Sequence, residues 1–198
     1  MGNKASRPLS IYVIGPSSTG KTTLCDTLAK RLGLPEHAYV TEVARDVMKT
    51  KGYSRHTIAS LQMQEDIMDA HFHREDALDA LEVPICLFDR SALDPIVYAI
   101  LTSKDSEEAK ARQAILVGSE RFQKVLQKYR AENSIVILLT PVPEWLVDDG
   151  VRSLESQNEC VMIFRKLLKD LRVDYYELGA EIKFIQERVV AVMGLGRF

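Results

Sequence analysis

The segment GPSSTGKT at residues 15–22 carries the residue types that bind polyphosphate, at the spacing this requires. It fits the pattern G-x-x-x-x-G-K-[ST], in which successive backbone N–H groups turn toward one anion. The two glycines permit the tight turn and the close approach of backbone to phosphate. Lys21 is expected to reach the β- and γ-phosphates, and the Thr22 hydroxyl to bind Mg²⁺. The predicted nucleotide-binding residues are Gly15, Ser17, Ser18, Thr19, Gly20, Lys21, Thr22 and Thr23.

The elements around this loop are those that such a site needs. Residues 9–14, LSIYVI, form an apolar run that predicts a strand buried on both faces. The segment KTTLCDTLAKRLGL has leucines at four-residue steps and predicts a helix that begins at Gly20 or Lys21. A chance match to the loop pattern is expected in roughly one chain of this length in a hundred, and this context lowers that rate further. The segment therefore predicts nucleotide binding.

A magnesium site in such a protein needs a carboxylate besides the threonine hydroxyl. Asp89 ends the apolar run VPICLFD, so we expect it at the carboxyl end of a second buried strand. The prediction is that Thr22 and Asp89 hold the metal together. The alternative interpretation is that Asp89 only caps the turn that follows the strand.

Apolar runs and amphipathic segments alternate along the whole chain. A long helical pattern extends from about Thr57 to Leu81, and SEEAKARQAILVGSERFQKVLQKYRA predicts one or two charged surface helices. Predicted strands lie in LSIYVI, the start of AYVTEVARD, VPICLFD, SIVILL and VDYYEL. Strands that alternate with helices indicate an α/β, three-layer P-loop NTPase fold with a five-stranded parallel sheet and helices on both faces. We expect one domain over residues 1–198, with residues 1–8 as a flexible lead-in.

The composition argues against several kinds of partner. The net charge is −2 and the sequence pI about 6.1, so we expect no nucleic-acid partner. No stretch has the ~18 apolar residues of a membrane span, and the N-terminus has no apolar signal region. Three cysteines without a CxxC pair indicate reduced thiols, and so a cytoplasmic location.

The first six residues, MGNKAS, fit the N-myristoylation pattern with Gly2 as the acceptor. A single acyl chain would give reversible membrane contact rather than stable insertion. The alternative interpretation is an unmodified lead-in.

Three classes of P-loop protein compete for this sequence. A motor ATPase places a water-activating glutamate after the strand-end aspartate, whereas Arg90 follows Asp89 here. A regulatory GTPase carries Asn-Lys-x-Asp after a later strand, and LLTPVPEW contains nothing similar. A small-molecule kinase must exclude water and position an acceptor hydroxyl, which suits the missing glutamate.

Such a kinase needs an acceptor-site carboxylate and positive charges near the transferred phosphoryl group. Glu42, after the second strand, is expected to bind or deprotonate the acceptor hydroxyl, with Arg45 three residues later. Arg90 and Asp94 in DRSALD are expected to flank the site. The alternative interpretation of Glu42 and Arg45 is a surface ion pair.

The segment PEWLVDDGVRSLESQNE, residues 143–159, follows the predicted strand SIVILL and has the features of a lid, which we place at about 145–160. Gly150 would act as a hinge and Arg152 as a mobile positive charge. Trp145 offers a flat apolar surface for an aromatic ring. Asp148 and Asp149 would bind ribose hydroxyls or pair with lysines. The alternative interpretation is a solvated loop with Trp145 in the core.

These residues suggest a known family. EWLVDDGVRSL, GPSSTGKTTL, TEVAR and the strand-end FD resemble, in order, the ribosylnicotinamide kinase domain of the bacterial NAD-biosynthesis regulator. FDRSALDPIVYA is more similar to the related AAA-like ATPase family, and Arg90 and Ser91 after the aspartate depart from the kinase pattern. The resemblance implies a P-loop kinase fold, ATP with Mg²⁺, phosphorylation of a ribosyl hydroxyl and stacking of the acceptor ring on Trp145.

The sequence therefore predicts transfer of the ATP γ-phosphoryl group to a hydroxyl of a nucleoside-like small molecule, with nicotinamide riboside as the leading candidate. The predicted catalytic residues are Lys21, Glu42, Asp89, Arg90 and Arg152. The alternative is a nucleotide-dependent switch that binds ATP or GTP, tethered to a membrane through its acylated N-terminus.

Overall fold

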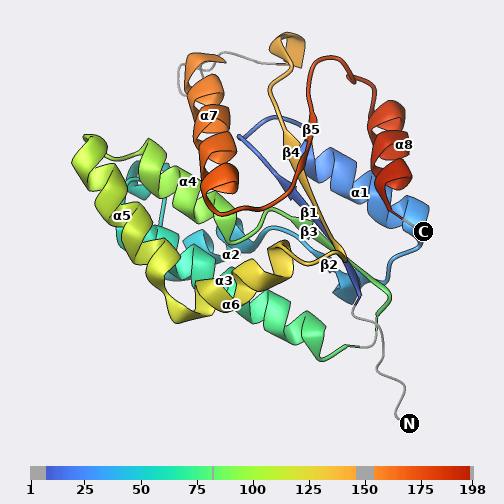
Figure 1. Cartoon of the computed structure of the whole chain (residues 1–198), viewed down its shortest axis with the longest axis horizontal. Coiled ribbons are helices and arrows are strands. Elements are labelled where there is room, and N and C mark those ends of the chain that lie inside the picture. Colours follow the sequence, from blue (N-terminus) through green and yellow to red (C-terminus); the bar gives the residue numbers. More distant parts are fainter. Residues whose placement is uncertain (1–7, 82, 146–153, 197–198) are drawn as a thin grey trace.

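The protein has the five-stranded parallel sheet that the sequence predicts. A computed structural model describes residues 8–81, 83–145 and 154–196. The strands are β1 (Leu9–Ile14), β2 (Tyr39–Val40), β3 (Ile85–Asp89), β4 (Ser134–Leu139) and β5 (Tyr176–Leu178). Every neighbouring pair is parallel, in the order β2-β3-β1-β4-β5 (Figure 1). The strand that precedes the phosphate loop thus lies at the centre of the sheet.

Eight α-helices and three short 3-10 helices connect these strands in the described part of the chain. The α-helices are α1 (Lys21–Leu32), α2 (Val43–Lys51), α3 (Leu61–Asp79), α4 (Leu93–Leu101), α5 (Ser106–Gly118), α6 (Glu120–Tyr129), α7 (Leu154–Asp170) and α8 (Ile185–Leu195). The 3-10 helices are Glu36–Ala38, Arg55–Thr57 and Pro143–Trp145. None of the described helices is long and apolar enough to cross a bilayer.

One prediction of helix extent was wrong. The pattern from Thr57 to Leu81 is not one helix, because α3 begins only at Leu61, where the Ser60 hydroxyl accepts a hydrogen bond from the Met63 backbone N–H at 3.4 Å. Helix α7 begins at Leu154, within the predicted lid range of about 145–160, and residues 146–153 lie outside the described part of the chain, so the lid stays a prediction.

The predicted charged surface helices are two helices, of which one has a buried face. Ser119 separates α5 from α6, and its hydroxyl accepts a hydrogen bond from the Phe122 backbone N–H at 3.2 Å. The buried residues of α6 are Phe122, Val125, Leu126 and Tyr129. Charged residues on the other face of α6 hid this apolar stripe in the sequence.

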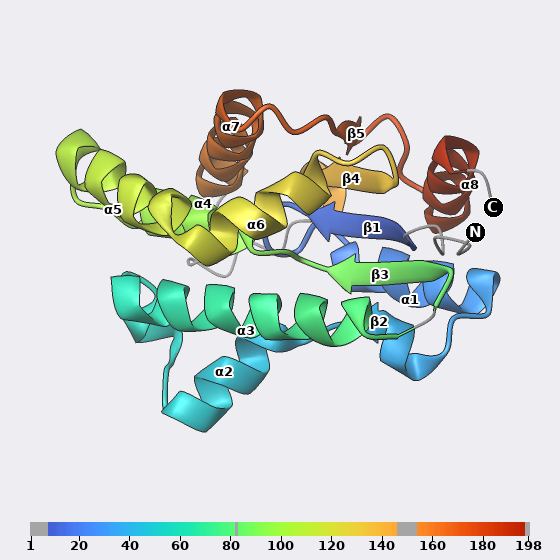
Figure 2. The same cartoon turned by 60° about the horizontal axis from the view of Figure 1, so that its bottom comes forward.

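The central strand is buried because helices cover both of its faces. Ile11 and Val13 join the apolar cluster formed with α1 and α8. Tyr12 and Ile14 point the other way, into a cluster formed with α3, α4, α6 and α7. Figure 1 shows these two groups of helices on opposite sides of the sheet. In Figure 2 the arrowheads of β1 and β3 point in the same direction, so the carboxyl ends of both strands meet at one edge of the sheet.

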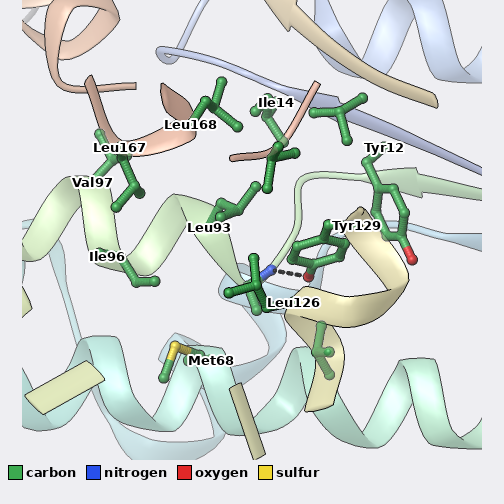
Figure 3. Close-up of a cluster of buried hydrophobic side chains, with 14 of the residues drawn as sticks. Tyr12, Ile14, Met68, Leu93, Ile96, Val97, Leu126, Tyr129, Leu167 and Leu168 are labelled. Carbon is green, nitrogen blue, oxygen red and sulfur yellow. Dashed lines mark hydrogen bonds between the residues drawn. The ribbon is translucent and has the colours of Figure 1, made fainter. Parts of the chain in front are cut away.

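A buried polar network connects the larger core to the turn after β3. The Tyr129 hydroxyl accepts a hydrogen bond from the Ala92 backbone N–H at 3.1 Å and donates one to Glu75 at 2.7 Å. Figure 3 shows Tyr129 beside Tyr12, whose hydroxyl is 3.5 Å from the same glutamate. The Lys128 ammonium lies 3.7 Å from the Glu75 carboxylate. Helix α6 therefore fixes the start of α4 through hydrogen bonds as well as apolar contacts.

This network makes a testable prediction about stability. Burial raises the pKa of the Glu75 carboxyl from its ordinary 4.5 to about 7, so the folded chain holds a proton that the unfolded chain releases. This residue therefore lowers the free energy of unfolding by about 3 kcal/mol as the pH rises from about 4.5 to 7. Glu75→Gln keeps an acceptor for Tyr129 but cannot ionise, so we expect it to lose less stability than the wild type between pH 5 and pH 8. Urea unfolding at both pH values measures this, and equal losses would contradict it.

Candidate functional site

The phosphate loop has the backbone geometry that the sequence predicts. Gly15 and Gly20 have φ angles of 134° and 85°, and Ser18 has a φ angle of 61°. A Cβ atom at position 15 would collide with the carbonyl oxygen of Leu139 at the end of β4, so only glycine fits there. The Thr19 hydroxyl donates a hydrogen bond to the Pro16 carbonyl at 3.0 Å and braces the loop from within.

Lys21 is buried at the start of α1. Its ammonium group donates to the Pro16 carbonyl and lies 3.4 Å from the Thr19 hydroxyl. Burial and, to a smaller extent, nearby Arg90 lower the pKa of Lys21 to about 7, although Asp94 and Asp89 act in the opposite direction. An anionic group beside Lys21 would favour its charged form.

Thr22 and Asp89 form the pair that a P-loop magnesium site requires. The Thr22 hydroxyl donates a hydrogen bond to Asp89 Oδ2 at 2.6 Å, and the other carboxylate oxygen, Oδ1, is buried with no hydrogen-bond partner in the described part of the chain. The described residues contain no group of three or more His, Cys, Asp or Glu that could hold a metal. These oxygens therefore fit Mg²⁺ as a partial shell, which nucleotide oxygens and water would complete.

The turn after β3 contains a partly buried ion pair between Arg90 and Asp94. Arg90 has a φ angle of 78°, and its Nη1 atom donates to Asp94 Oδ1 at 2.9 Å and lies 3.4 Å from the Gly15 carbonyl oxygen. The other oxygen of Asp94 accepts a hydrogen bond from the Ser91 backbone N–H at 2.9 Å. Burial raises the pKa of the Asp94 carboxyl, whereas Arg90 and then Lys21 lower it. The turn thus places a guanidinium group beside the phosphate loop.

Glu42 lies two residues after the end of β2 and, like Arg90, has left-handed backbone. Its φ angle is 59°, a left-handed conformation that is unfavourable for a residue with a side chain. Strained backbone of this kind is concentrated at functional sites. Its carboxylate also forms an ion pair with Arg45 at 2.6 Å, and the Arg45 side chain is 80% exposed. The predicted pair therefore forms, and its surface position keeps the ion-pair interpretation open.

A cavity of about 760 Å³ lies at this edge of the sheet, bordered by α2, α3, α4 and α7. Seven of the predicted site residues line it: Ser17, Thr22, Glu42, Arg45, Asp89, Arg90 and Asp94. The sequence did not single out other residues that line it, among them Met63, Gln64, His71, Tyr98, Gln157 and Cys160. These occupy ordinary positions in helical patterns, and only the packing of the helices makes them part of one cavity.

Trp145 lies on a different side of the phosphate loop. It is 41% exposed and is not among the described residues that line the cavity. Its ring would lie 3.3 Å from a Cβ atom at Gly20, and the Arg188 guanidinium lies 4.7 Å from the ring centroid. Stacking of an acceptor ring on Trp145 stays a prediction.

Arg188 anchors the phosphate loop to α8 and was missed in the sequence. Its side chain is buried and donates to the carbonyl oxygens of Thr19 at 2.9 Å, Gly179 at 3.2 Å and Ile182 at 2.7 Å. In the sequence it looks like a solvent-facing position of an amphipathic helix, because its partners are backbone atoms that carry no sequence signal.

Five predicted residues lie outside the part of the chain that the structure describes. They are Gly2, Asp148, Asp149, Gly150 and Arg152. Their roles, including that of a lid arginine, stay predictions.

Comparison with solved structures shows the fold of P-loop kinases. The NadR protein in complex with NR superposes with a TM-score of 0.70 at 18% identity, covering 97% of this chain and 52% of that chain. Deoxyadenosine kinase from M. mycoides with bound dATP has a TM-score of 0.63 at 14% identity, covering 94% and 97%. Thymidylate kinase from Candida albicans has a TM-score of 0.61 at 16% identity, covering 96% and 91%. This chain therefore spans about half the length of the NadR chain and nearly all of the two kinases.

No curated protein matches the chain in sequence. A family model described as AAA domain matches residues 10–187, which include the phosphate loop, both predicted metal ligands and α7. Since this match covers far more than half of the 198 residues, the chain belongs to the AAA domain family.

Proposed function

We propose that this protein is an ATP-dependent kinase that transfers the γ-phosphoryl group to a hydroxyl of a nucleoside-like small molecule. One observation carries the proposal: the Thr22–Asp89 pair, the Arg90–Asp94 pair and Glu42 all line one cavity. Its volume of about 760 Å³ falls within the ~300–1,000 Å³ typical of small-molecule sites. Groups for a phosphoryl donor and for a hydroxyl acceptor thus share one space.

The donor side of the proposed site is built from β1, α1 and β3. The loop amides and Lys21 would bind the phosphates of ATP, and Thr22 and Asp89 would hold Mg²⁺. When bound, Mg²⁺ would supply positive charge that offsets the charge developing on the phosphate oxygens. The buried position of Lys21 excludes water from its ammonium group and strengthens its attraction for phosphate.

On the acceptor side, Glu42 would accept the proton of the attacking hydroxyl. A carboxylate at the end of β2 reaches the same cavity as the metal pair at the end of β3, which is the placement a general base needs. Arg45 would orient this carboxylate through their ion pair. The left-handed backbone of Glu42 would hold its side chain toward the cavity, so that its position would not depend on a flexible loop.

Arg90 would stabilise the charge on the phosphoryl group during transfer. Asp94 holds the guanidinium, and the Gly15 carbonyl lies within 3.4 Å of it, so the group is preorganised next to the phosphate loop. Arg90 occupies the position at which a hydrolysing enzyme would carry its water-activating glutamate, and this favours transfer over hydrolysis. Arg152 in the lid is proposed to add a second positive charge.

Nicotinamide riboside is the leading candidate acceptor. The motif resemblance of the lid segment and the likeness to the NadR protein, solved in complex with NR, both support this choice. ATP and Mg²⁺ as the donor pair are supported by the likeness to a NadR structure in complex with NAD and AMP-PNP.

The reaction itself can be tested with a panel of nucleosides that includes nicotinamide riboside. We expect ATP to be converted to ADP only when an acceptor is present, with equal amounts of ADP and phosphorylated acceptor by mass spectrometry. ATP turnover at the same rate with every acceptor and with none would contradict the kinase and favour the nucleotide-dependent switch.

The proposed base can be tested with Glu42→Gln, which keeps the size of the side chain and removes its charge. We expect kcat to fall by about a hundredfold or more, because the hydroxyl proton loses its acceptor, while ATP affinity stays within about twofold. Asp46→Asn is the matched control, an acidic residue on the same helix outside the cavity. Unchanged turnover of Glu42→Gln would remove this residue from the mechanism.

The metal pair can be tested with Thr22→Ala, which removes the hydroxyl that donates to Asp89. We expect the additional thermal stabilisation that Mg²⁺ gives to the ATP complex to disappear and kcat to fall by about tenfold or more. Thr27→Ala is the control, because its hydroxyl bonds only to the backbone of α1, at 2.7 Å to the Thr23 carbonyl. A variant that responds to Mg²⁺ as the wild type does would argue against Thr22 as a ligand.

A further inference from the structure

The cavity contains buried polar atoms that the proposed transfer reaction does not use. Among the described residues, five buried side-chain nitrogen or oxygen atoms have no hydrogen-bond partner, and four of them belong to residues that line this cavity. One is Asp89 Oδ1, which the proposed metal site explains. The others are His71 Nε2 and both amide atoms of Gln157. Buried polar atoms without partners are rare in folded proteins, so these three require an explanation.

The two residues come from different helices. His71 lies on α3 and is 1% exposed, and Gln157 lies on α7 and is 3% exposed. Nearby Gln64 contrasts with them, because its amide nitrogen donates to the Ile58 carbonyl at 2.9 Å. The unsatisfied atoms are therefore a property of these two side chains and not of the whole α3 surface.

The hydrogen-bonding capacity of the pair can be read from its chemistry. A glutamine amide offers one acceptor oxygen and two donor hydrogens side by side. Burial and, to a smaller extent, nearby Arg90 lower the pKa of His71 to about 3, so its ring is neutral at physiological pH. A neutral ring offers one donor or one acceptor at Nε2. The pair therefore suits an uncharged partner that both donates and accepts.

Apolar and aromatic side chains line the same cavity as these polar atoms. Met63 and Ile67 of α3, Tyr98 and Leu101 of α4, and Cys160 one turn after Gln157 line the same cavity. An apolar wall with a few polar atoms that fix orientation is the usual construction of a small-molecule site.

We propose that Gln157 and His71 form the polar end of the acceptor subsite and recognise a planar heterocycle that carries an amide or carboxamide group. This assignment rests on the proposed function for the position of the reacting hydroxyl, but the recognition of the ring does not require turnover. The amide of the ligand would pair with the amide of Gln157, donor to acceptor and acceptor to donor. His71 would supply the third hydrogen bond.

The test uses two pairs of ribosides whose members differ in the amide. Nicotinamide riboside is compared with pyridine riboside, and inosine with purine riboside, on the full chain. Affinities are measured by calorimetry in the presence of Mg²⁺ and a non-hydrolysable ATP analogue. In the pair that fits the cavity, we expect the wild type to bind the riboside with the amide at least tenfold more tightly than the riboside without it. A wild type that discriminates neither pair overturns the proposal.

The variant Gln157→Leu has a similar volume and no polar atoms. We expect it to lose the preference for the amide member, while its affinity for the member without the amide changes by less than about threefold. Gln62→Leu is the control, the same change at an exposed position of α3 outside the cavity. Equal losses for both members of a pair overturn the proposal, since they would mean a general disturbance of the cavity.

Thermal stability separates recognition from a structural role. An unpartnered buried amide costs stability, so Gln157→Leu and His71→Leu should melt at the same temperature as the wild type or higher without ligand. A lower melting temperature would show that the side chain supports the fold, and would overturn its assignment to the ligand. Discrimination in binding without any phosphoryl transfer would support this subsite and contradict the kinase, so the two proposals can fail separately.

Discussion

The parallel pairing of β1 with β3 is the constraint on which the site depends. Their register places Val13 opposite Asp89, and the Arg90 backbone N–H donates to the Val13 carbonyl at 2.9 Å beyond the end of β3. Because both strands end at this edge, the phosphate loop and the turn after Asp89 leave the sheet side by side. The 2.6 Å hydrogen bond from Thr22 to Asp89 is a consequence of this pairing. Any shift of register would separate the two proposed metal ligands.

Most of the fold could be predicted because a parallel sheet needs strands that are apolar on both faces. Runs such as LSIYVI and SIVILL have no other simple interpretation between amphipathic segments. The ends of helices were less predictable, because single side chains decide them. Helix α3 begins at Leu61, four residues after the start of the periodic pattern, because the Ser60 hydroxyl caps it there. The buried apolar stripe of α6 was missed because charged residues at neighbouring positions make the segment as a whole look polar.

Among the candidate site residues, those at strand ends could be predicted from the sequence, and those that depend on the packing of helices could not. Glu42 and Arg90 follow strand ends, and the carboxyl ends of parallel strands converge on the ligand in open α/β sheets, so position along the chain was informative. His71 and Gln157 are ordinary residues of helices, and what distinguishes them is burial without a partner. The side-chain hydrogen bonds of Arg188 all go to backbone carbonyls. Such features arise only when helices far apart in sequence pack together.

The edge of the sheet that holds the site also holds several unfavourable features of the described structure. Glu42 and Arg90 adopt left-handed backbone, and Asp89, His71 and Gln157 carry the unpartnered buried atoms around the cavity. Features of these kinds cost of order 1–3 kcal/mol each. A ligand that supplies partners for the buried atoms would remove part of this cost while it is bound, and would stabilise the folded chain by an amount that grows with the logarithm of its concentration divided by its Kd. In the proposed site, the positions at which the fold gives up stability are therefore those at which a ligand would gain affinity and specificity.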